Sequence, residues 1–365
     1  ICAAEKHAPK TEGASKLVPR AYRKALQYAK KSPAYLREMA EDFWKRGAWI
    51  PLGLLMEEQA KAETNSTDKA QMLVELAEFR AFKLNNLQGA VVSYLEAALL
   101  DDSLINVIRE SLEQLYDAHS DNDEVIDGLA TLLETQGEYH ALFKLLTEVY
   151  VQQPAVEGLP RRFELALRAG QIAGKHLSQW DTAIDCLDSA KTAGPDRLNL
   201  VRKTAESLLQ HSDGQENLLR FLVKISTDEE DWSHAASYLQ QLAQQSTALK
   251  DRAHWQFIRG EILWDRLKDQ DAALNDFETS SLLDPEMTDR VAEKFRESIK
   301  NCSDAAVRTQ LESRLTELLK NAGRNEDVVT IWQSQLESTT DRISRVRLLC
   351  AIGDAHRTEL RQPEK

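Results

Sequence analysis

The sequence predicts an all-α solenoid built from antiparallel helix hairpins, and three observations carry that prediction. A small residue recurs at Ala77, Gly170, Gly260 and Gly353, at intervals of 93, 90 and 93 residues. Apolar residues recur at spacings of three and four along much of the chain, which is the period of an amphipathic helix. Nine prolines and fourteen glycines in 365 residues are few, which favours helices over a β-sandwich. A fixed long period indicates units that bury their apolar faces against their neighbours.

Residues 1–18 include Pro9 and several lysines and predict a flexible basic lead-in. Residues 19–66 predict N-terminal helices and half of a repeat unit. The helical pattern starts at Tyr22, and a further helix opens after a Ser-Pro pair and ends at Gly47.

Charge is unevenly distributed along the chain. The net charge is −13, and an acidic surface repels phosphate backbones, so we expect no nucleic-acid ligand. Residues 1–37 nevertheless carry nine basic and two acidic side chains. This basic N-terminal arm is either a solvated segment or a contact for an acidic partner or membrane surface. No apolar run approaches the roughly 18 residues that a membrane span needs.

The cysteines favour a reducing compartment. Cys2, Cys186, Cys302 and Cys350 lie far apart, so no zinc or redox motif is visible. Scattered single cysteines favour the cytoplasm. Cys2 stands near the first residue, Ile1, and leaves a lipidated or exported form open.

The repeat units share a pattern in their second helices. Thirteen residues after each of the first three small residues stands an alanine: Ala90, Ala183 and Ala273. In each unit a bulky residue follows four positions later, a small residue three after that, and a proline or aspartate five after that. Small residues let two helices approach, the bulky residue fills the space opposite, and proline stops the helix.

This pattern resembles the tetratricopeptide repeat, a helix–turn–helix unit of about 34 residues. The match is closest at Ala273, Phe277, Ser280 and Pro285. The glycine-to-alanine interval is thirteen, one more than in the family motif, which predicts a turn one residue longer. The resemblance implies a right-handed superhelix with a concave groove lined by the first helices.

A second, weaker hairpin occurs in each period. In its second helices a bulky residue follows four positions after each of Pro51, Ala141, Ala235 and Val328. An aromatic residue opens three of these helices: Trp49, Tyr139 and Trp232. We therefore predict units of two hairpins each, over 67–154, 155–247 and 248–339. Residues 340–365 predict the first helix of a further unit, with an apolar face that lacks its partner helix, as expected of a piece of a longer protein.

No catalytic, cofactor or metal constellation is visible in the sequence. It contains no phosphate loop, dinucleotide fingerprint, nucleophile elbow or kinase signature. None of the eight histidines lies four residues from another, which is the spacing of a helical metal site. We expect a chain that is not an enzyme.

The resemblance implies protein–protein interaction, with the chain as a scaffold or adaptor for a protein or peptide. Candidate groove residues, chosen by their positions on first helices, are Arg80, Lys83, Arg168, Gln171, Arg259 and Arg266. Two alternatives stay open: a regulatory solenoid within a larger enzyme or signalling protein, and a self-assembling structural scaffold. The identity of the partner, the pathway and the oligomeric state are not encoded in any motif.

Overall fold

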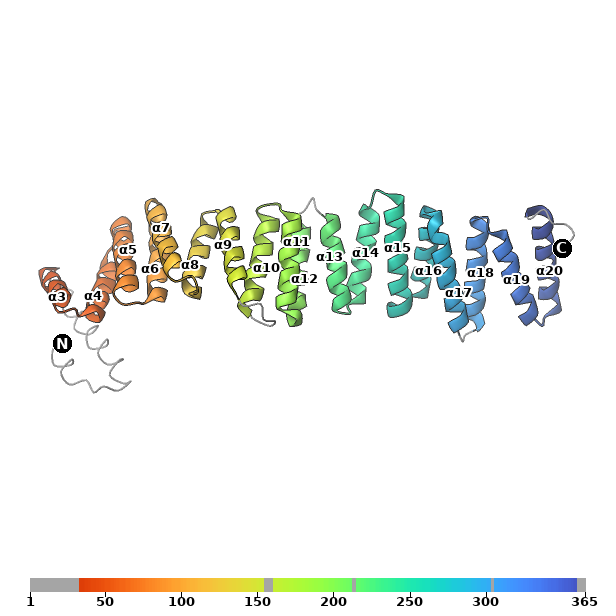
Figure 1. Ribbon diagram of the computed structural model, residues 1–365, viewed down its shortest axis with the longest axis horizontal. Helices are drawn as coiled ribbons and strands as arrows, with labels where there is room; N and C mark the ends of the chain where they lie inside the picture. The colour runs from red at the N-terminus through yellow and green to blue at the C-terminus, as the bar shows by residue number, and fades with distance from the viewer. Residues whose placement is uncertain (1–32, 154–159, 212–214, 303–304, 360–365) are drawn as a thin grey trace, which may run out of the picture. The chain divides into compact units, whose positions relative to one another are not determined.

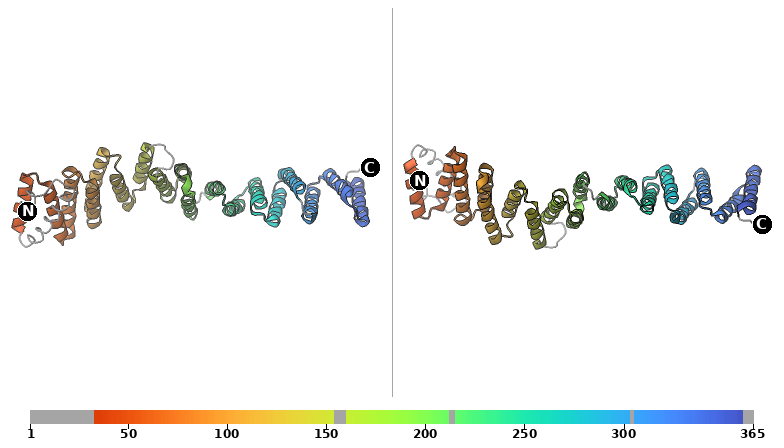
Figure 2. Two further views of the ribbon diagram at one scale, coloured as in Figure 1. Left: turned by 90° about the horizontal axis from the view of Figure 1, so that it is seen from below. Right: turned by 90° about the horizontal axis from the view of Figure 1, so that it is seen from above.

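The computed structural model describes residues 33–153, 160–211, 215–302 and 305–359, and those ranges contain helices and no strand. The chain divides into two compact units, 1–155 and 156–365. Within each unit the helices follow one another in chain order and each packs against the next, as Figures 1 and 2 show. The predicted all-α solenoid is therefore confirmed for each unit. The hand of the superhelix stays a prediction, and most of the basic N-terminal arm lies outside the described residues.

The first unit holds seven α-helices and one 3₁₀ turn within its described residues. They are α3 (Pro33–Lys45), α4 (Trp49–Ala62), α5 (Ser66–Phe82), α6 (Leu87–Leu100), η1 (Asp102–Leu104), α7 (Ile105–Ala118), α8 (Asp123–Thr135) and α9 (Tyr139–Gln152). The aromatic residues expected to open the weaker hairpins' second helices are the first residues of α4 and α9, which confirms their assignment.

The second unit continues in the same manner over its described ranges. Its first elements are α10 (Pro160–Lys175), α11 (Trp180–Ala193), η2 (Pro195–Arg197), α12 (Leu198–Leu209), α13 (Gln215–Asp228) and α14 (Trp232–Gln245). Next come α15 (Leu249–Ile262), η3 (Leu263–Leu267), α16 (Gln270–Leu283), η4 (Pro285–Met287) and α17 (Thr288–Asn301). The last are α18 (Ala305–Asn321), α19 (Asn325–Ser338), α20 (Arg342–Asp354) and η5 (Ala355–Glu359).

Each period contains one helix more than the two predicted hairpins. The additional helices are α7, α12 and α17, which stand between the stronger and the weaker hairpin. Asp102, Pro195 and Pro285 were expected to follow the end of a second helix, and each instead begins a 3₁₀ turn that leads into a new helix. Proline fits that place because the first turn of a helix does not use its missing N–H.

The turn inside the stronger hairpin is the same in all three periods. Asn85, Ser178 and Lys268 each lie eight residues after the motif's small residue, and their φ angles are 50°, 54° and 61°. These non-glycine residues therefore adopt the left-handed conformation. In the third period the first helix ends in the π-helical η3, which takes more residues per turn.

Close contact between the paired helices explains the small residues at the repeat position. A Cβ added to Gly260 would lie 2.7 Å from the Cε1 atom of Phe277, and one added to Gly170 would lie 3.1 Å from Leu187. Ala77 is fully buried at the equivalent place in α5. The predicted pairing of a small residue on the first helix with a bulky residue on the second is thus confirmed.

Candidate partner-binding site

Two of the predicted groove arginines tie the first helix of a hairpin to the second. In α5, Arg80 donates from Nη1 to the Oγ atom of Ser93 at 2.6 Å and lies 2.9 Å from Oε2 of Glu57. In α15, Arg259 donates from Nη1 to Oδ1 of Asp276 at 2.9 Å. Ser93 and Asp276 hold the same repeat position, three residues after the alanine of the second helix. Both guanidinium groups therefore stabilise hairpins, and a role in partner binding stays a prediction.

Burial perturbs the carboxylate in the second of these pairs. The Asp276 side chain is only 9% exposed. Burial raises the pKa of Asp276 to about 6, although the neighbouring Arg259 opposes the shift. The charged form of this carboxylate is disfavoured because it has lost water as a partner. The hairpin of α15 and α16 therefore contains a group that titrates below neutral pH.

Two other predicted residues cover aromatic rings at the joints between hairpins. The Nζ atom of Lys83 lies 5.6 Å from the ring centroid of Trp49, and the guanidinium carbon of Arg266 lies 4.6 Å from that of Trp232. Lys83 and Arg266 stand six residues after Ala77 and Gly260, and each aromatic residue opens the preceding helix. These cation–π contacts recur at one repeat position and stabilise the joint.

The remaining two predicted residues lie on α10. Arg168 is half-buried and has interaction partners of its own, and Gln171 is exposed. The Nε2 atom of Gln171 lies 3.5 Å from Oγ1 of Thr204 on α12. The six predicted residues thus lie on or just after the first helices α5, α10 and α15, and their role in partner binding stays a prediction.

A pocket of about 370 Å³ lies between α16 and α18 in the second unit. Apolar side chains form part of its wall: Leu282, Pro285, Leu318 and Ala322. Polar side chains complete it: Glu278, Ser281, Thr288, Arg314, Glu317 and Asn321. The pocket therefore combines an apolar surface with a polar rim.

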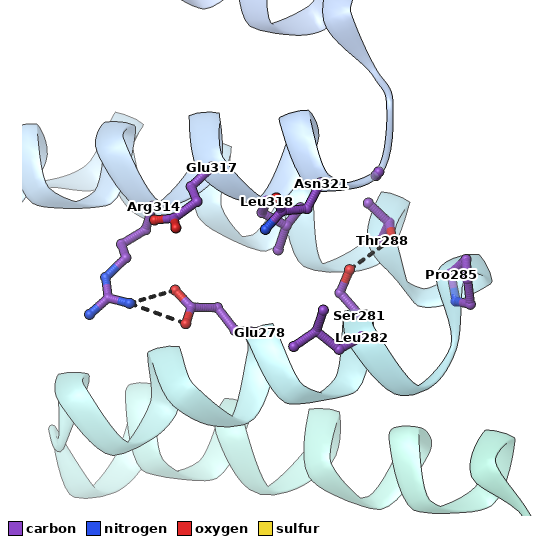
Figure 3. A pocket seen from close by; sticks show the side chains of 10 residues that line it. Glu278, Ser281, Leu282, Pro285, Thr288, Arg314, Glu317, Leu318 and Asn321 are labelled. Atoms are coloured by element: carbon purple, nitrogen blue, oxygen red, sulfur yellow. Dashed lines mark hydrogen bonds and ion pairs between the residues drawn. The ribbon is translucent and has the colours of Figure 1, made fainter.

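Two polar pairs hold the walls of this pocket in place (Figure 3). Nη1 of Arg314 lies 2.9 Å from Oε1 and 3.1 Å from Oε2 of Glu278. The hydroxyl oxygens of Ser281 and Thr288 lie 2.8 Å apart. Leu282 projects between them and is 74% exposed. A large apolar side chain that stays exposed in a walled pocket is a candidate contact for a partner.

The preceding period repeats the bridge across these helices. Nζ of Lys224 on α13 lies 2.9 Å from Oδ1 of Asp188 on α11. Both bridges join residues 36 apart, and both acidic residues stand five positions after the repeat alanine. A channel of about 550 Å³ runs along the α11–α13 bridge. Exposed ion pairs of this kind contribute only about 0–1 kcal/mol, so their recurrence points to a surface feature more than to stability.

The size of the side chain at one repeat position explains why space remains between α11 and α13 and between α16 and α18. In the first unit Gly128 of α8 packs against α6 so closely that an added Cβ would lie 2.3 Å from Cγ1 of Val91. The equivalent positions of the second unit hold Phe221 and Leu311, both buried. Bulky side chains keep α11 from α13, and α16 from α18, at a greater distance than glycine requires.

Sequence reasoning did not select the residues of this pocket. A signal was present, because Asp188 and Lys224 in one period correspond to Glu278 and Arg314 in the next. Opposite charges held at the same spacing in two periods predict a bridge between two helices. Single-helix patterns do not show it, since the two partners belong to helices that are not consecutive.

Metal-site geometry and thiol reactivity can be assessed in the described residues. They contain no group of three or more His, Cys, Asp or Glu side chains placed to hold a metal ion. Burial, with a smaller effect from Asp185, raises the pKa of the Cys186 thiol to about 11, so its reactive thiolate form is suppressed. No helix in the described ranges is both long and apolar enough to cross a membrane.

No protein-family model and no curated protein matches this chain. Solved structures do match. The chain is similar to tetratricopeptide-repeat proteins. One such protein, from Parabacteroides merdae, is 13% identical over 77% of this chain and 98% of its own, with a TM-score of 0.21. Yeast Tom70 is 12% identical over 95% of this chain and 93% of its own, with a TM-score of 0.21.

A further match is the structure of Naa15/Naa10 bound to HypK-THB, at 12% identity and a TM-score of 0.28. It covers 94% of this chain and 60% of that chain. Scores this low add nothing to the site. The fold assignment rests on the helices and their packing in this chain.

Proposed function

We propose that this chain is a non-catalytic scaffold that binds another protein, with the α16–α18 pocket as an anchor for one apolar side chain of that partner. The observation that carries the proposal is the exposure of Leu282, which is 74% accessible within a pocket of about 370 Å³. Pockets near this size bury a compact apolar group and orient it with a few polar contacts.

The rim of the pocket suits a peptide backbone on either side of such an anchor. Asn321 supplies an amide, and Ser281 and Thr288 supply hydroxyls. The Glu278–Arg314 bridge stands at one end, where a charged residue of the partner could exchange with it. Interfaces of this type concentrate binding energy in a buried apolar contact surrounded by polar groups.

Charged side chains that pack against neighbouring helices support a scaffold function. Arg80, Arg259, Lys83 and Arg266 contact side chains of neighbouring helices in the same unit. A stack of hairpins held by such contacts presents a broad surface that a partner protein can recognise by its shape and charge. Contact of the basic N-terminal arm with an acidic partner, and a cytoplasmic location, stay predictions.

The test is selection of peptides from a displayed library against the intact chain, followed by affinity measurement with the Leu282→Asp variant. Loss of one buried apolar contact of about 1.5–3 kcal/mol would weaken binding roughly 10- to 100-fold. Leu282 is exposed, so the variant is expected to fold normally, which circular dichroism checks.

Leu99→Asp provides the matched control. Leu99 stands at the same repeat position in α6 and is 82% exposed. We expect it to leave the affinity unchanged. Equal affinities for the wild type and Leu282→Asp would refute the pocket as the anchor, and a selection that yields no binding peptide would refute the scaffold function for this surface.

A further inference from the structure

The α16–α18 pocket has a counterpart in the preceding period, where a lysine side chain fills the equivalent place. Ser281 and Leu318 of the pocket stand at the repeat positions of Lys191 on α11 and Asp228 on α13. The Nζ atom of Lys191 lies 2.5 Å from Oδ2 of Asp228, and the lysine side chain is only 20% exposed. In that period a lysine of the chain itself therefore spans the gap between the two helices.

The equivalent place between α16 and α18 is open. Serine is much shorter than lysine, and the hydroxyl oxygen of Ser281 lies 2.8 Å from that of Thr288 (Figure 3). Leu318 stands where α13 has its aspartate, and it forms part of the apolar wall of the pocket. The pocket therefore leaves room for a side chain like that of Lys191, supplied by another molecule.

The carboxylate of Glu317 has no hydrogen bond or ion pair among the described residues. It lines the pocket from α18 and is exposed. Two basic residues stand one turn away on the same helix, but Arg314 is bound to Glu278, and Lys320 lies over the Trp332 ring at 4.6 Å. Glu317 therefore remains accessible to a cation from outside the chain.

The lining of the pocket matches the two parts of a lysine side chain. Leu282, Leu318 and Ala322 offer an apolar wall for the methylene groups, and Glu317 offers a carboxylate for the ammonium group. A lysine side chain buries its stem on apolar surface while its charged end stays near water. Two carboxylates and one guanidinium line the pocket, so its charge favours a cation over an anion.

We propose that the α16–α18 pocket binds a basic segment of another protein, which inserts a lysine side chain with its ammonium group against Glu317. The methylene groups of that lysine lie along Leu318 and Ala322, beside the apolar anchor at Leu282. The inference rests on the proposed function of this pocket and adds the charge of the partner. An acidic segment is disfavoured because it would meet the unpaired carboxylate.

The probe is hexylammonium, which has an apolar stem like that of lysine and one positive charge at neutral pH. Hexanoate and hexanol carry a similar stem with a negative charge and with no charge. Ligand-observed NMR titration of the intact chain should show hexylammonium binding about three- to fivefold more tightly than hexanol, as expected of one solvent-exposed ion pair. Hexanoate should bind more weakly than hexanol.

Glu317→Gln should remove this preference, so that the variant binds hexylammonium and hexanol equally. Glu326→Gln is the matched control, because Glu326 is exposed on α19, does not line the pocket and carries the same charge. The control variant should keep the three- to fivefold preference. The comparison separates a contact at Glu317 from the general attraction of cations to an acidic chain.

Two substitutions at Ser281 test whether the pocket corresponds to the place of Lys191. Ser281→Lys introduces the residue type of the preceding period, should fill the pocket from within the chain, and should weaken hexylammonium binding at least about fivefold. Ser281→Ala removes the same contact with Thr288 but leaves the space open, so it should bind as the wild type does. Circular dichroism checks that each variant stays helical.

Three results would overturn the proposal. They are binding of hexanoate as tight as that of hexylammonium, an undiminished preference for hexylammonium in Glu317→Gln, or unchanged hexylammonium binding in Ser281→Lys. The peptide selection that tests the proposed function gives a separate answer. Selected peptides that need Leu282 but bind Glu317→Gln as tightly as the wild type would keep the scaffold function and refute the lysine contact. The expected hexylammonium results without any selected peptide would support the cation contact and refute the scaffold function.

Discussion

Replacing the repeat glycine by alanine is expected to change stability in opposite directions at Gly260 and at Gly353. Replacing glycine by alanine inside a helix stabilises it by about 1 kcal/mol, because glycine loses more backbone freedom on folding. In Gly260→Ala the new Cβ would lie 2.7 Å from Cε1 and 2.9 Å from Cδ1 of the Phe277 ring. In Gly353→Ala it meets no atom of the described residues within 4 Å.

The Phe277 ring has little room to move away from the new methyl group. It is 2% exposed, and its centroid lies 5.5 Å from that of Phe257 and 6.0 Å from that of Phe295. Overpacking of this kind costs about 1–3 kcal/mol. After the helix gain of about 1 kcal/mol, we expect Gly260→Ala to be destabilising by about 1 kcal/mol. Gly353→Ala should be stabilising by up to about 1 kcal/mol.

Hydrogen exchange followed by mass spectrometry is the suitable assay, since repeat arrays open locally and do not unfold in a single step. Protection of amides in α15 and α16 should fall in Gly260→Ala, and protection in α20 should rise in Gly353→Ala. A second substitution, Phe277→Leu, should reduce the cost of Gly260→Ala, because a Cβ added at Gly170 would lie 3.1 Å from the leucine at the equivalent position, Leu187, compared with 2.7 Å from the Phe277 ring. Increased protection of α15 in Gly260→Ala would refute the reasoning.

Three further predictions concern the α15–α16 hairpin. Burial raises the pKa of Asp276 to about 6, so the folded hairpin binds this proton more tightly than the unfolded chain does. The resulting stabilisation of the hairpin is fully present below pH 4 and is lost as pH rises through 6. Asp276→Asn should therefore gain on the order of 2 kcal/mol relative to wild type between pH 4 and 7 in the free energy of local opening of α15 and α16 measured by hydrogen exchange, and a constant difference would contradict this. Arg259→Glu should remove protection of α15 without any partner present, at a cost of about 3 kcal/mol; unchanged exchange would show that the pair is dispensable. Lys268→Gly should raise the melting temperature, because glycine adopts φ near 61° without strain, and a lower value would count against a strained turn.

The Arg259 prediction changes how partner binding should be tested. A charge reversal there combines loss of the hairpin with loss of any groove contact, so it does not distinguish the two. Leu282 avoids this difficulty because it is exposed and has a matched counterpart at Leu99. Exposed positions with a repeat equivalent therefore give cleaner tests of function than the six residues selected from helix position.

The local pattern of residues was sufficient to predict the hairpins. A helix shows its buried face as apolar residues three and four apart, and the close approach of its partner as a small residue such as Gly260. The aromatic residues Trp49, Tyr139 and Trp232 likewise marked helix starts that the structure confirms. The third helix of each period was missed although its periodicity was present, as in Ile108, Leu112 and Leu115, because proline was read only as the end of a helix.

By itself, the sequence determined the fold class, the long period and the position of the small residues that let paired helices touch. Only the tertiary structure decided that Arg80 and Arg259 hold hairpins together and that Glu278 and Arg314 frame a pocket. The physical reason is the range of the interactions. Helix periodicity is evident within a dozen consecutive residues. A salt bridge or a pocket depends instead on distances between helices that are separate in sequence.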